Sequence, residues 1–83
     1  KKRDFIFDDD LLTDNPNDLI NDPSIDVIVE VMGGVGLAKE IILKSLKSGK
    51  SVVTANKAVI ARYGSEIYST AAENRVYVLM HNL

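Results

Sequence analysis

The chain has 83 residues, of which 46% are hydrophobic and 27% charged, and its formal net charge at pH 7 is -2. This composition is typical of a folded globular domain, and the length allows one small domain with a thin margin of stability. The slight acidic excess supplies no basic field for a phosphate backbone, which excludes nucleic acid as an expected partner.

The chain has no cysteine and a single histidine. Neither a disulfide framework nor a thiolate or histidine-rich metal site is therefore expected, and the lack of disulfides is compatible with the cytoplasm, where we expect the protein. No apolar run approaches the roughly 20 residues that a membrane-spanning helix needs, so no membrane partner is expected.

The first part of the chain is rich in acids and turn-forming residues. The basic residues 1–3 are interpreted as a solvated charge run; the alternative is that one of them accepts a phosphate group of a ligand. Leu11 to Thr13 is predicted as a short strand. A short helix is expected to begin with Pro16 in its first turn and to carry Ile20 inward.

A run rich in β-branched residues extends from Ile25 to Met32 and leads directly into glycines. Such a run is typical of a parallel strand buried on both faces, so Val27 and Val29 are expected to be buried. The next segment, Leu37 to Ser48, places apolar residues at helical spacing and is followed by Gly49 as the C-terminal cap. This segment is predicted as an amphipathic helix that buries Ile41, Ile42 and Leu46.

Ser51 to Thr54 is predicted as a second strand with Val53 buried, Ala58 to Glu73 as a helix broken near Gly64, and Val76 to Met80 as a third strand. Strands that alternate with crossover helices predict the α/β class, with a parallel sheet and right-handed connections. In open sheets of this kind ligands bind beyond the carboxyl ends of the strands, so the loops after Met32 and Thr54 are the places to look for chemistry.

The first of these loops contains Gly33, Gly34 and Gly36. Glycines let the backbone take positive φ and let a flat ligand approach closely, but a tight strand-to-helix turn would need them equally. The spacing is not that of the G-x-G-x-x-G fingerprint, so no pyrophosphate is expected here. Glu30 precedes the loop inside an apolar strand, where a structural hydrogen bond and a ligand contact are equally plausible.

The second loop contains Thr54, Ala55, Asn56 and Lys57. Thr and Asn offer donors and acceptors to a ribose or an amide, and a desolvated lysine can accept the carbinol proton that leaves during hydride transfer. The alternative is that Asn56 caps a helix and Lys57 is a solvated residue of its first turn. The chemistry of these residues by itself favours that alternative.

The residues from Asp26 to Gly34, followed by the stretch from Gly49 to Ala58, resemble homoserine dehydrogenase in both residue identity and spacing. The resemblance implies NAD- or NADP-dependent interconversion of L-homoserine and L-aspartate 4-semialdehyde, in the pathway to threonine and methionine. It also implies that Gly33 and Gly34 border the nicotinamide, that Thr54, Ala55 and Asn56 line the cofactor, and that Lys57 lies in the active site as the catalytic residue.

The same resemblance implies that residues 1–83 form the C-terminal half of an NAD(P)-binding Rossmann domain, without the first strand-turn-helix unit and without a substrate domain. Such a fragment is expected to be inactive alone and, because the missing strand exposes an apolar sheet edge, to form homo-oligomers. Where the family has a Glu-Ala-Ser/Thr-Val-like stretch, this chain has His81 and Asn82. The competing interpretation is a non-catalytic half-domain that serves as a structural or interaction module.

Overall fold

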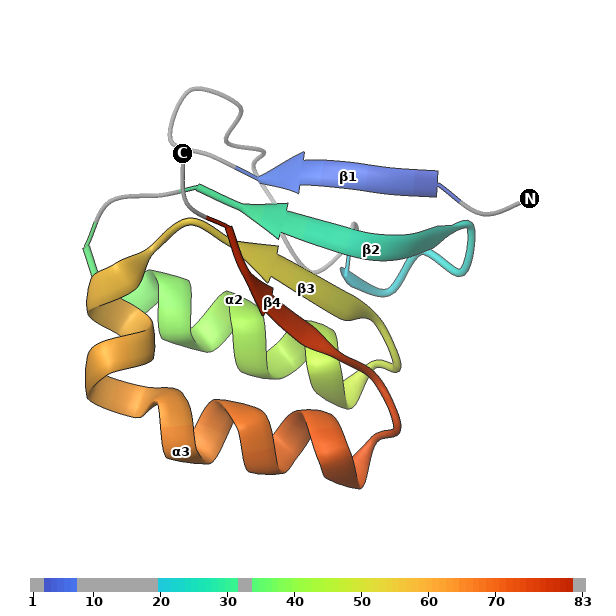
Figure 1. The fold of residues 1–83 in the computed structure, drawn as a ribbon. Helices are drawn as coiled ribbons and strands as arrows, with labels where there is room; N and C mark the ends of the chain where they lie inside the picture. Colours follow the sequence, from blue (N-terminus) through green and yellow to red (C-terminus); the bar gives the residue numbers. More distant parts are fainter. Residues whose placement is uncertain (1–2, 8–19, 32–33, 82–83) are drawn as a thin grey trace.

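The computed structural model describes residues 3–7, 20–31 and 34–81. These residues contain one parallel sheet of four strands in the order β1-β2-β3-β4. Two helices, α2 and α3, lie on the same side of this sheet (Figure 1). The predicted α/β class, with a parallel sheet and crossover helices, is confirmed. The elements are β1 Arg3–Phe7, β2 Ile25–Glu30, α2 Gly36–Lys47, β3 Ser51–Thr54, α3 Lys57–Glu73 and β4 Val78–Met80.

Strand β1 was not predicted. It pairs in parallel with β2, from Arg3 opposite Ile25 to Phe7 opposite Glu30. Arg3, the last residue of the basic run, begins this strand. The aromatic and β-branched residues that follow favour a strand, but the flanking charges hide this short signal. The strand predicted at Leu11 to Thr13 and the start of the helix predicted at Pro16 lie outside the described residues.

The helix predicted at Leu37 to Ser48 is confirmed as α2, shifted by one residue at each end. Gly49 ends it in a Schellman motif with a φ of 82°. In this motif the Gly49 N–H donates to the Leu46 carbonyl and the Lys50 N–H to the Ser45 carbonyl, both at 3.0 Å. No helix within residues 20–31 and 34–81 is long and apolar enough to cross a membrane.

Helix α3 ends in the same motif, but the left-handed position is held by Arg75, with a φ of 56°. Its N–H donates to the Ala72 carbonyl at 3.2 Å, and the Val76 N–H donates to the Ala71 carbonyl at 3.0 Å. The break predicted near Gly64 is confirmed as a kink at Tyr63, whose φ of -126° and ψ of 15° are not helical. The chain changes direction at this kink, so the two parts of α3 lie at a clear angle to each other (Figure 1).

Arg75→Gly is expected to raise the free energy of unfolding by about 1 kcal/mol, because only glycine adopts the left-handed conformation without a clash at Cβ. Urea unfolding followed by circular dichroism measures the difference. Ala72→Gly, at an exposed position inside the same helix end, is the control and should lower stability by up to about 1 kcal/mol. Equal effects of both glycines would contradict the explanation.

The core lies between the sheet and the two helices. Ile41, Ile42 and Leu46 are buried there, as predicted, against Ile28 and Val52 of the strands. The predicted burial of Val27, Val29 and Val53 was wrong, because all three are only half-buried. Their side chains alternate with the buried residues and point to the second face of the sheet, which no helix covers within the described residues. A strand of β-branched residues is buried on both faces only when both faces are covered.

At the amino ends of the strands, Lys50 is buried and ties β3 to the turn before β2. Its Nζ donates to the backbone carbonyls of Asp22 and Ile25, each at 2.7 Å. The same turn is closed by Asp22, whose carboxylate accepts from the Ser24 hydroxyl at 2.7 Å and from the Ser24 N–H at 2.9 Å. The amino end of the sheet is therefore held by polar contacts that do not involve the loops at the carboxyl end.

Candidate functional site

The carboxyl ends of β2, β3 and β4 lie in one row, with Glu30 opposite Thr54 and Thr54 opposite Met80. The glycine loop, of which the structure describes Val31, Gly34 and Val35, lies between β2 and α2 in the chain. The Asn56 loop, residues 55–56, leads from β3 into α3 (Figure 1). Parallel pairing therefore brings the two loops that the sequence singled out to the same edge of the sheet.

Glu30 and Thr54 are both fully buried, with 0% of each residue exposed. The Thr54 hydroxyl donates to Glu30 Oε1 at 2.5 Å and accepts from the Asn56 N–H at 3.0 Å. The backbone carbonyl of Glu30 accepts from the Ala55 N–H at 3.0 Å. Of the two interpretations of Glu30, the structural hydrogen bond is thus the one observed, and the donor of Thr54 is already engaged within the fold.

Asn56 is buried, and its side-chain amide bonds two other described residues, Val59 and Gly34. Its Oδ1 accepts from the Val59 N–H at 3.1 Å, which caps α3 at its third residue, as the structural alternative predicted. Its Nδ2 donates to the Gly34 carbonyl at 2.6 Å. The second bond was not predicted: it joins the Asn56 loop to the glycine loop.

Gly34 has a φ of 82°, in the left-handed region that glycine adopts without strain. The position that a Cβ would take at Gly34 is open, and the same holds at Gly36. The backbone at Gly34 and Gly36 is therefore open to the close approach of a flat ligand. Gly33 lies outside the described residues.

Lys57 is exposed and is the first residue of α3, next to Asn56. Its place at the start of the helix puts the amine at the same sheet edge as the two loops. The described residues do not bury the Lys57 side chain.

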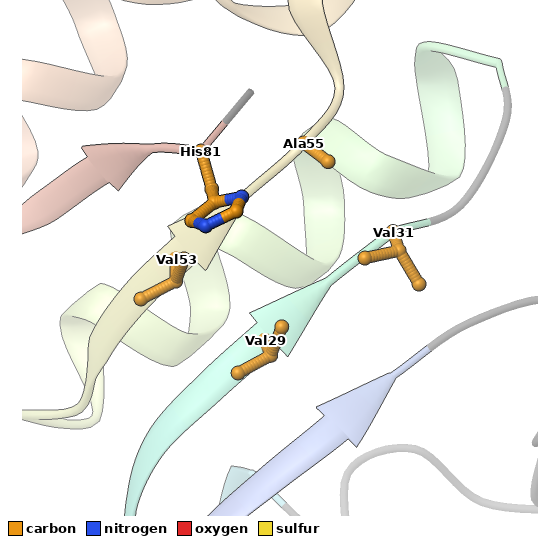
Figure 2. A pocket seen from close by; sticks show the side chains of 5 residues that line it. All are labelled: Val29, Val31, Val53, Ala55 and His81. Carbon is orange, nitrogen blue, oxygen red and sulfur yellow. The ribbon is translucent and has the colours of Figure 1, made fainter. Parts of the chain in front are cut away.

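A shallow pocket of about 170 Å³ opens on the second face of the sheet (Figure 2). It is lined by Val29, Val31, Val53, Ala55 and His81, and the imidazole points into the same space as the valines. The backbone N–H of His81 donates to the Thr54 carbonyl at 2.8 Å, which extends the pairing of β4 with β3. The sequence analysis missed this pocket; the signal was the alternation that places these residues on one face.

Comparison with known proteins identifies the family. The family model for the NAD-binding domain of homoserine dehydrogenase matches residues 1–81. Homoserine dehydrogenase from Synechocystis sp. is 48% identical over 71 residues, which is 86% of this chain and 16% of the relative. The enzyme from Pseudomonas aeruginosa is 52% identical over 61 residues, 74% of this chain and 14% of the relative.

Solved structures agree. A homoserine dehydrogenase from Thiobacillus denitrificans superposes with a TM-score of 0.78 at 44% identity, over 82% of this chain and 16% of that one. The Staphylococcus aureus enzyme does so with a TM-score of 0.76 at 38% identity, over 83% of this chain and 17% of that one. The chain spans only about a sixth of the length of these proteins. It belongs to the homoserine dehydrogenase family and matches the NAD-binding domain of that family.

Proposed function

We propose that the protein containing this chain is a homoserine dehydrogenase, which interconverts L-homoserine and L-aspartate 4-semialdehyde with NAD or NADP. The observation that carries the proposal is the match of residues 1–81 to the NAD-binding domain of this family. The arrangement of the site supports it, because the glycine loop and the Asn56 loop meet at the carboxyl edge of the sheet, where such domains bind their ligands.

Within this proposal, Gly33 and Gly34 border the nicotinamide, and Thr54, Ala55 and Asn56 form the loop beside it. The open space at Gly34 supports a close approach of the ring to the backbone. When bound, the nicotinamide supplies the acceptor for the hydride that leaves the carbinol carbon. Lys57, as a neutral amine, takes the proton from the carbinol oxygen, so that the carbonyl forms as both leave.

The complete protein tests this function directly. Purified enzyme incubated with L-homoserine and NAD or NADP is expected to produce the reduced nicotinamide, measured by its absorbance. L-serine, whose hydroxyl lies one carbon closer to the amino group, is the control and should react far more slowly. Absence of turnover with L-homoserine and both dinucleotides would refute the proposal.

We further propose that the protein works in the cytoplasm as a homo-oligomer. The half-buried valines of the second sheet face and the exposed Leu79 and Tyr77 beside them leave apolar surface uncovered within the described residues. The 83-residue chain alone is therefore expected to self-associate as its concentration rises. Sedimentation velocity over a range of concentrations measures this, and a monomer at every concentration would contradict it.

A further inference from the structure

Three buried side chains connect the glycine loop and the Asn56 loop in series. Glu30 and Thr54 are 0% exposed and Asn56 is 8% exposed. The Thr54 hydroxyl bonds Glu30, the Asn56 N–H bonds the Thr54 hydroxyl, and the Asn56 side chain bonds the Gly34 carbonyl. We call these three residues the brace. Its last bond joins residues that are 22 positions apart in the chain.

The direction of each bond in the brace follows from its neighbours. The Thr54 hydroxyl has one hydrogen, which goes to the Glu30 carboxylate, so its lone pairs face the Asn56 N–H. The Asn56 amide has only one workable orientation, because flipping it would set Oδ1 against the Gly34 carbonyl and the amide NH₂ against the Val59 N–H. The brace is therefore a polarised network rather than a set of interchangeable contacts.

We propose that the brace is a positioning device: Glu30, Thr54 and Asn56 act on the cofactor by holding the glycine loop in place, and their side chains do not bind it directly. The proposal rests on the proposed function and assigns these residues a role in it. Two of the three are fully buried and the third nearly so, which keeps their polar groups from a ligand at the surface. Buried hydrogen bonds of this kind favour one arrangement of the loops they join.

The brace fixes the glycine loop at Gly34. Its backbone has a left-handed φ of 82°, and the place that a Cβ would take has no neighbour within 4 Å, so packing does not hold Gly34 on that side. The bond from Asn56 to its carbonyl supplies that hold. A loop already ordered before the ligand arrives loses less entropy on binding, which raises affinity without any new contact to the ligand.

Asn56→Ser separates the two tasks of Asn56. Serine is about as good an N-cap as asparagine, so the bond to the Val59 N–H is kept, whereas the donor to the Gly34 carbonyl is lost. In a complete homoserine dehydrogenase containing this chain, the Kd for the reduced nicotinamide cofactor should rise about tenfold, the factor that corresponds to one net hydrogen bond. Asn56→Ala, which loses the cap as well, should match this Kd but melt at a lower temperature.

Thr54 is fully buried and supplies a matched pair of variants. Thr54→Val keeps the shape of the side chain and removes the hydroxyl, so the Kd for the cofactor should rise, as in Asn56→Ser. Thr54→Ser keeps the hydroxyl and should leave this Kd near the parental value. If Asn56 instead contacted the cofactor itself, Asn56→Ser would raise the Kd while Thr54→Val left it at the parental value. That pattern would overturn the proposal.

Hydrogen exchange in the cofactor-free enzyme gives a readout that does not depend on binding or turnover. Amides of residues 34–36 should exchange several-fold faster in Asn56→Ser and Thr54→Val than in the parent, with amides of α2 beyond its first turn unchanged. Unchanged exchange in this loop would refute the brace. An enzyme that binds no nicotinamide at all would refute the proposed function instead, and the exchange experiment would still decide the role of the brace.

Discussion

In a complete homoserine dehydrogenase containing this chain, Lys57→Ala is expected to lower turnover of L-homoserine by roughly 100-fold or more, with a smaller effect on nicotinamide affinity. The reason is the position of Lys57: it is the first residue of α3, directly after Asn56, at the carboxyl edge of the sheet. A neutral amine there can take the carbinol proton as the hydride leaves. Steady-state kcat and KM, together with the cofactor Kd, separate the two effects.

Lys57→Arg should not restore turnover, because a guanidinium stays protonated and cannot accept a proton. Lys47→Ala is the control: Lys47 is also an exposed lysine, in the last turn of α2, and its removal should leave kcat unchanged. Were Lys57 only a solvated residue of the first turn of α3, Lys57→Ala would give near-parental kinetics and a stability change within about 0.5 kcal/mol.

Ile42→Ala is expected to lower the free energy of unfolding by roughly 2 to 5 kcal/mol. Ile42 is fully buried between α2 and the sheet, and truncation removes apolar contacts and leaves a cavity in the single core of the domain. A domain of this size has a thin margin of stability, so the variant of the isolated chain should be largely unfolded at room temperature. Urea unfolding of the parent and circular dichroism of the variant measure the loss.

Leu37→Ala is the matched control on the same helix, since Leu37 is 53% exposed and should change stability by no more than about 0.5 kcal/mol. Val53→Ala should fall between the two, because the second sheet face leaves Val53 half-buried. A cost below about 1 kcal/mol for Ile42→Ala would show that the core is not packed as described.

The sequence by itself determined the elements whose signals are local. The apolar spacing of α2, the left-handed Gly49 that ends it and the β-branched runs of β2 and β3 each act over a few residues, so each could be predicted without knowledge of the partner elements. The place of the site followed from the same order, because parallel strands bring their carboxyl ends to one edge. The capping role of Asn56 was also local, since its acceptor lies three residues from the Val59 N–H.

Only the tertiary structure decided what depends on residues distant in the chain. Whether Val29 and Val53 are buried depends on which face of the sheet α2 and α3 cover, and a run of valines carries no information about that choice. Strand β1 is assigned through its pairing with β2, about 20 residues further along the chain. The brace is the clearest case: the Thr54 hydroxyl reaches Glu30 and the Asn56 amide reaches Gly34 because parallel pairing places the ends of β2 and β3 side by side.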